Sequence, residues 1–171
     1  MGSLTSLINY LDRIVRVANA LSKCILFLTM LMMVTTVGSR VIGIPIVGIP
    51  SLTEILFVCS IYLTIAYVQR TKSNIAVDVF VLRLPKSKQQ ILAIIQLILP
   101  LAFCLLIISA SWDFAFDSWQ LREATDGEPF HPIYPAKITV ALGVTLLLLQ
   151  IFADLIQEIK SYITKSSERQ F

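Results

Sequence analysis

Four long apolar segments, separated by polar ones, set the pattern of this chain. A helix needs about 20 apolar residues to cross the hydrocarbon core of a bilayer. The segments approach that length, and they cover about residues 20–42, 51–69, 90–110 and 136–156. The uncharged part of the first is short, but Lys23 and Arg40 at its ends can extend their long side chains to the interface. The pattern predicts an all-α membrane protein, a single domain over residues 1–171 with four transmembrane helices.

Residues 4–19, before the first span, alternate between apolar and polar positions at helical spacing. Apolar side chains recur every three or four residues, and Arg13 and Arg16 occupy the other face. We expect an amphipathic helix that lies on phospholipid with its cations toward phosphate. The alternative is that this segment simply extends the first span into water. Arg13, Arg16 and Lys23 are then predicted membrane-interface anchors.

One acidic residue, Glu54, lies within the second span. Two Gly-Ile-Pro sequences between residues 41 and 50 predict a short apolar hairpin before it. Ser51 is a plausible N-cap, which would place Glu54 in the first turn, where the helix dipole favours an anion. Because Arg40 should emerge nearby, we favour a structural ion pair or a subunit contact for Glu54 over a transport carboxylate.

The connector between the second and third spans, residues 70–88, holds five of the fourteen basic residues. Its stretch 75–84 is largely apolar, and Asn74 and Asp78 are four residues apart, on one side of a helix. The connector is therefore predicted to contain a short interfacial helix.

The third span contains Pro100 at its centre, which predicts a kink. A polar segment, 111–135, follows and contains five acidic residues between Trp112 and Lys137. We expect it to be an acidic outer loop, with Trp112 and Trp119 in the aromatic belt at the membrane surface.

Composition and charge agree with a membrane protein and fix its orientation. The chain is 56% hydrophobic and 15% charged, whereas soluble domains average about 25% charged residues. Eleven of the fourteen basic residues lie on the side of the termini and the connector. Since cytoplasmic loops are enriched in Lys and Arg, both termini are predicted to be cytoplasmic. A net charge of +3 gives no indication of nucleic-acid binding.

The sequence contains no set of residues that would support catalysis. Its three cysteines lie apart in apolar runs, and its one histidine, His131, has no nucleophile near it in sequence. No phosphate-binding glycine motif is present. We therefore expect neither an enzyme nor a cofactor site. The central thirds of the spans lack charge, which favours a subunit that supports another chain.

Several short motifs resemble the small membrane subunit of tripartite ATP-independent periplasmic (TRAP) transporters, the DctQ-like or Q subunit. The family often carries a Gly-x-His-Ile-x-Val-Asp sequence after its second span; here Ile75, Val77 and Asp78 match, and Lys72 and Asn74 differ. The matching segments are Ser51-Leu-Thr-Glu-Ile55, Arg70 to Asp78, Tyr134-Pro-Ala-Lys137, Ala141-Leu-Gly143 and Leu149-Gln150.

The resemblance implies a scaffold role in the bacterial inner membrane. A Q subunit pairs with a large M subunit that carries the substrate and sodium sites, and a periplasmic binding protein delivers an organic acid. Transport in the family is sodium-coupled. Arg40, Glu54, Arg70 and Asp78 would then be structural or subunit-interface positions. The alternative hypothesis is a self-contained four-helix proton-coupled exporter with Glu54 as its coupling carboxylate.

Overall fold

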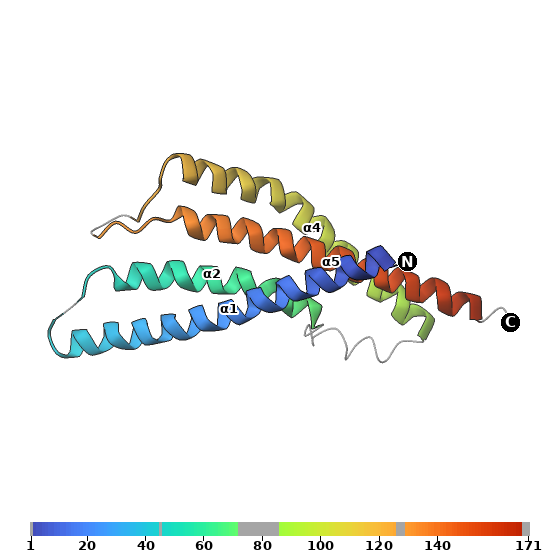
Figure 1. Cartoon of the computed structure of the whole chain (residues 1–171), viewed down its shortest axis with the longest axis horizontal. Helices are drawn as coiled ribbons and strands as arrows, with labels where there is room; N and C mark the ends of the chain where they lie inside the picture. The colour runs from blue at the N-terminus through green and yellow to red at the C-terminus, as the bar shows by residue number, and fades with distance from the viewer. Residues whose placement is uncertain (1, 45, 72–85, 126–128, 169–171) are drawn as a thin grey trace.

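The computed structural model describes residues 2–44, 46–71, 86–125 and 129–168, with side chains over 8–44, 46–71, 95–125 and 129–159. Each helix in this part of the chain contains a stretch long and apolar enough to cross a membrane. The helices are α1 (Gly2–Val41), α2 (Ile49–Arg70), α4 (Lys86–Gln120) and α5 (Tyr134–Glu168), drawn in Figure 1. The predicted all-α fold with four transmembrane helices is confirmed.

The N-terminal amphipathic segment is helical, but it is not a separate element. It forms the beginning of α1, which runs without a break from Gly2 to Val41. This agrees with the alternative in which the segment extends the first span. The predicted connector helix lies outside the described residues, as does Asp78.

The start of α2 differs from the prediction because a glycine, and not Ser51, caps it. Gly48 has φ 93°, a left-handed conformation that favours glycine. Pro50 follows at a position where its missing backbone N–H costs no helical hydrogen bond. As α2 begins at Ile49, Glu54 lies in its second turn.

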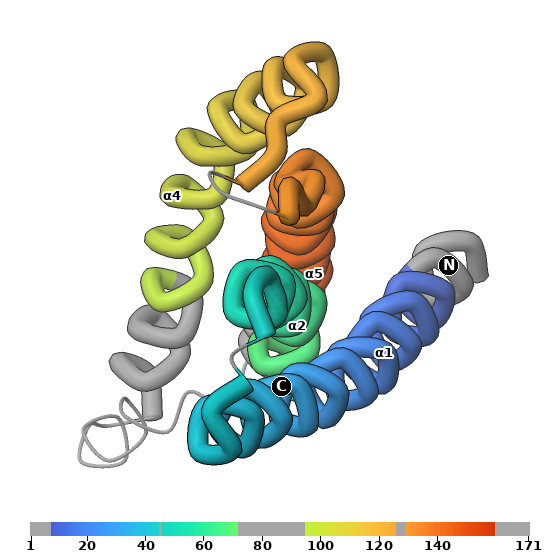
Figure 2. Tube along the Cα trace, turned by 90° about the vertical axis from the view of Figure 1, so that its left-hand side faces the viewer, coloured from blue at the N-terminus to red at the C-terminus, as the bar shows by residue number. Residues whose placement is uncertain are grey.

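The outer acidic loop is shorter than predicted. α4 continues past residue 111 to Gln120, so both Trp112 and Trp119 lie on a helix. The chain then leaves the helix where Arg122 takes a left-handed φ of 47°. The prediction placed the end of the helix where the apolar run ends. The charged residues that end this run do not end the helix, because its backbone hydrogen bonds form within the segment whatever the side chains are. Pro100 lies within α4, which Figure 2 shows as a bent rod.

The four helices form an open row and not a closed bundle. α1 packs against α2, α2 against α5, and α5 against α4, whereas α1 makes only slight contact with α5. Figure 2 shows this order, with α1 and α4 at the two edges. The N-terminal end of α1 and the C-terminal end of α5 lie at the same end of the row (Figure 1).

A glycine sets the closest approach at the central seam, between α2 and α5. A Cβ atom added to Gly143 would lie 2.9 Å from the carbonyl carbon of Tyr62 and closer still to its oxygen. Small residues at helix interfaces let backbones approach in this way. Buried alanines such as Ala66 and Ala141 maintain the tight spacing along α2 and α5.

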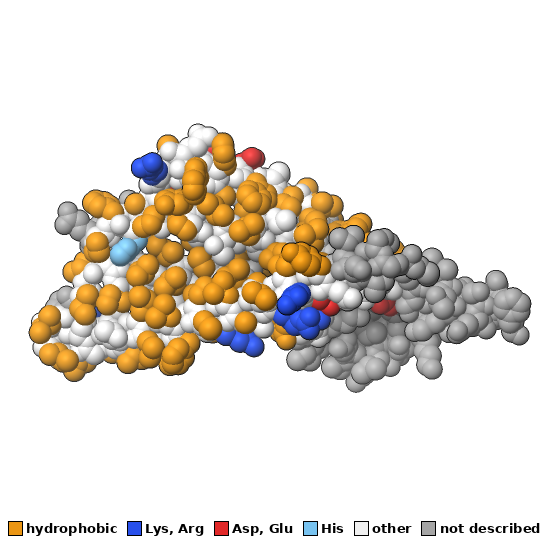
Figure 3. Space-filling view, in the orientation of Figure 1, with side chains coloured by type: hydrophobic (Ala, Val, Ile, Leu, Met, Phe, Trp, Pro, Cys, Tyr) orange, Lys and Arg blue, Asp and Glu red, His pale blue; other side chains and the backbone are white. Residues whose placement is uncertain are grey.

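The outside of the row is apolar. Figure 3 shows hydrophobic side chains over most of the described surface on this face, with few charged ones. Large side chains of the edge helices are among the most exposed, such as Val34 on α1 and Leu106 on α4. A soluble protein would not expose so much apolar area. The chain is therefore a multi-pass membrane protein.

Candidate functional site

A set of small polar side chains joins α1 to α2. Ser22 donates a hydrogen bond to the carbonyl oxygen of Ser60 at 2.7 Å. Thr64 donates to the Ser22 hydroxyl at 2.7 Å and lies 3.3 Å from the amide oxygen of Asn19. All of these except Thr64 are buried. Such bonds hold transmembrane helices together, because lipid offers these groups no alternative partner.

An ion pair connects the same two helices near the C-terminal end of α2. Arg70 donates two hydrogen bonds to Asp12, from Nε at 2.8 Å and from Nη2 at 3.0 Å. A bidentate pair of this kind fixes both distance and orientation. Sequence reasoning named Arg70 as a structural position but missed Asp12. Its only sequence signal is an acid on the otherwise basic polar face of residues 4–19.

A second polar link joins α2 to α5 near the same end. The amides of Gln69 and Gln150 both approach the carboxylate of Asp154, at 3.4 and 3.1 Å. Gln150 is almost fully buried. The end of the row that contains the chain termini is thus tied across three helices by hydrogen bonds.

At the opposite end, Lys137 of α5 ties down the loop that follows α4. Its ammonium group pairs with Glu123 and lies 3.9 Å from the centroid of the Phe114 ring. The hydrogen bond from Lys137 lowers the pKa of Glu123 below its ordinary value. The Glu123 carboxylate therefore stays ionised at neutral pH.

Both tryptophans predicted for the aromatic belt lie on α4 and contact α5. The indole N–H of Trp112 donates to Thr145 at 3.2 Å, and Trp119 packs edge-on against Tyr134 with ring centroids 5.2 Å apart. Both rings remain about half exposed. Their role as membrane-interface anchors stays a prediction, as does that of Arg13 and Arg16.

The predicted ion pair between Arg40 and Glu54 is not formed. Both residues are exposed, and the ion pairs among described residues are Arg70–Asp12 and Lys137–Glu123. The C-terminal end of α1, which carries Arg40, reaches beyond the start of α2 (Figure 1), whereas Glu54 lies in the second turn of α2. A subunit contact remains the favoured interpretation of Glu54.

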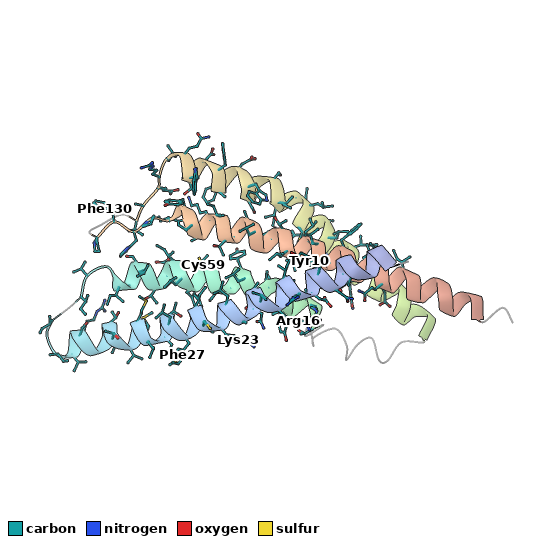
Figure 4. The ribbon with its side chains drawn as sticks, viewed as in Figure 1. Tyr10, Arg16, Lys23, Phe27, Cys59 and Phe130 are labelled. Carbon is teal, nitrogen blue, oxygen red and sulfur yellow. The ribbon has the colours of Figure 1, made fainter. Side chains whose placement is uncertain are left out.

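Glu54 lines an apolar groove of about 860 Å³ between α1 and α2. Figure 4 shows two of its α1 residues, Lys23 and Phe27. The lining residues recur every three or four positions, so they lie on one face of each helix. They are Lys23, Leu26, Phe27, Thr29, Met30 and Met33 on α1, and Pro50, Thr53, Glu54 and Phe57 on α2. The groove joins two charged side chains and an apolar surface, an arrangement suited to binding and not to chemical transformation.

Within the described residues, no group of three or more metal-ligating side chains comes together. Comparison with curated proteins and with solved structures found no match. The comparison with protein families did: residues 11–161 match the model described as tripartite ATP-independent periplasmic transporters, DctQ component. This match covers nearly all of the open helical row and the polar links within it. The chain therefore belongs to the DctQ family and is the small membrane subunit of a TRAP transporter.

Proposed function

We propose that this chain is the scaffold subunit of a sodium-coupled transporter that takes up an organic acid. In this proposal the chain enlarges the fixed part of the complex beside a large membrane subunit, which carries the substrate and sodium sites. A periplasmic binding protein delivers the ligand. The chain lies in the bacterial inner membrane with both termini in the cytoplasm, as the distribution of its basic residues favours.

The open row of helices is the observation that supports this proposal. Transporters that act alone usually hold their substrate between broken helices near the midplane. Here the described helices are continuous, and the described ion pairs lie toward the ends of the row. An open row offers its faces to another protein and does not close around a substrate.

Reconstitution tests the proposal directly. The chain should copurify with the large subunit encoded beside it. Proteoliposomes that contain both, supplied with the binding protein, should take up an organic acid only when a sodium gradient is present. Uptake at the full rate by the large subunit alone would refute the scaffold role.

The exporter hypothesis makes a different prediction from the same preparation. If the chain acted alone, its proteoliposomes would move substrate under a proton gradient, and Glu54→Gln would abolish that movement. We expect no such transport, because Glu54 is an exposed residue near one end of α2, in its second turn, and not near the midpoint of that helix.

A further inference from the structure

Lys23 lies level with the middle of α2. Its neighbour Ser22 donates a hydrogen bond to Ser60, and Ser60 is near the midpoint of the helix Ile49–Arg70. The 22 residues of α2 extend about 33 Å, close to the hydrocarbon thickness of about 30 Å. Figure 4 shows the same relation, with Lys23 alongside central α2 and Arg16 closer to the C-terminal end of α2. With α2 taken as the segment that crosses the hydrocarbon core, we infer that Lys23 lies near the bilayer centre, which differs from the interface position predicted from the sequence.

A charge at this depth is unfavourable without a partner. The Lys23 side chain is exposed, and none of the described ion pairs includes it. Glu54 lines the same groove but does not pair with it. Side chains lean toward the N-terminus of their helix, and α1 and α2 are antiparallel. Lys23 therefore leans toward the end with the chain termini, whereas Glu54 leans toward the opposite end.

The groove opens where α1 and α2 are no longer linked by side chains. The described side-chain bonds between them lie at Ser22 or closer to the chain termini, ending with Arg70 and Asp12. Beyond Ser22, two buried threonines, Thr29 and Thr53, form the floor. Their hydroxyls bond to backbone carbonyls of their own helices, so they require no external partner. The walls contain phenylalanines and methionines, and the flexible methionine side chains can adapt to an irregular apolar surface.

We propose that this groove is the docking site for a transmembrane helix of the large subunit. The docking helix carries a carboxylate opposite Lys23 and a basic group opposite Glu54. This inference rests on the proposed function, since it requires a large membrane partner. It goes further by naming the face of the chain, the kind of element that binds there, and the charges that direct it.

The depth of Lys23 favours a protein over a phospholipid. The phosphate of a lipid lies at the membrane surface, about half of the hydrocarbon thickness from Lys23, so a lipid supplies no anion at the bilayer centre. A second copy of this chain fits no better. Two copies related by a twofold axis along the membrane normal would place one Lys23 at the same depth as the other, and like charges repel there.

Site-specific photocrosslinking tests the location. A benzoylphenylalanine is introduced at Phe27 or Met30 in the groove, and in matched variants at Phe103 or Leu106 on exposed α4. In membranes that contain the full complex, the groove positions should crosslink to the large subunit. Capture of the large subunit only from the α4 positions would overturn the inference, and so would groove crosslinks only to lipid or to a second copy. In each case copurification would still support the proposed function.

The charge requirement is tested with Lys23→Leu, and Arg16→Leu serves as the control on the same face of α1. Truncating one member of a desolvated charge pair weakens a complex by about 30-fold or more. We expect Lys23→Leu to lower recovery of the large subunit to that extent and Arg16→Leu to leave it unchanged. Lys23→Leu should not lower the melting temperature of the isolated subunit, because Lys23 has no partner among its described residues. Equal recovery with both variants would overturn the inference, and so would a lower melting temperature with Lys23→Leu. If the unmodified chain did not bind the large subunit at all, the proposed function itself would fail.

Discussion

Replacing Gly143 with alanine tests the central seam of the row with a single methyl group. The new Cβ would lie 2.9 Å from the carbonyl carbon and the Cβ of Tyr62, where ordinary contacts begin at 3.4 Å. α5 would have to retreat from α2 by at least about 0.5 Å. The nearest obstacle is backbone, which cannot rotate away. Overpacking of this kind costs about 1–3 kcal/mol.

A gain in helix propensity offsets part of that cost. Alanine is favoured over glycine within a helix by about 1 kcal/mol, so the expected net loss for Gly143→Ala is up to about 2 kcal/mol. Gly38→Ala is the matched control. Gly38 also lies within a helix, but nothing lies within 4 Å of its added Cβ. The same substitution there should raise stability by about 0.5–1 kcal/mol.

Equilibrium unfolding in mixed micelles, followed by tryptophan fluorescence, measures both variants. A change of 1 kcal/mol corresponds to about 2–4 °C in Tm for a chain of this size, so thermal unfolding gives a second readout. The diagnostic result is that Gly143→Ala lowers the free energy of unfolding whereas Gly38→Ala raises it. If Gly143→Ala proved as stable as Gly38→Ala, the close contact between α2 and α5 would be wrong.

Three further predictions concern charged residues of the chain. Asp12→Asn and Arg70→Gln, combined in a double-mutant cycle, should show a coupling of about 1 kcal/mol, since the pair is only partly exposed; no measurable coupling would contradict the ion pair. The carboxylate of Glu123 has a lowered pKa in the folded chain, so its contribution is complete above the ordinary pKa of glutamate and is lost as the pH falls through the lowered value. Lys137→Met should flatten that acid dependence of stability, and an unchanged profile would exclude the pair as its source. Asp78→Lys should reduce copurification of the large subunit without altering which substrate is carried, and a changed preference in uptake assays would contradict a purely structural role.

The architecture could be predicted because hydropathy reports directly on membrane crossing. Helix ends could not, since charge marks where the bilayer stops and not where backbone hydrogen bonding stops. α4 therefore runs on through Trp112 and Trp119, past the expected boundary. The capping of α2 depends on one backbone dihedral, at Gly48, that no local pattern of apolar residues encodes.

Long-range partners were equally beyond reach from one sequence. Asp12 and Arg70 are separated by 58 positions, and nothing local indicates which acid the arginine meets. The order of helices in the row is hidden for a related reason. Most positions of each span are apolar, and a few small polar side chains such as Ser22 do not by themselves identify the neighbouring helix. The position of Lys23 level with the middle of α2 follows only from the hydrogen bond between Ser22 and Ser60, which the sequence does not indicate.

The order of the row has a consequence for how the chain is assembled during synthesis. α1 and α2 are consecutive and can pair as a hairpin as soon as both are inserted. α4 is made next, but its principal neighbour is α5, which is made last. α4 must therefore wait in the membrane without its main packing surface, and α5 completes the row by entering between α2 and α4. A chain released before Tyr134 would leave a paired hairpin and a solitary helix, so the final span determines when the subunit becomes whole.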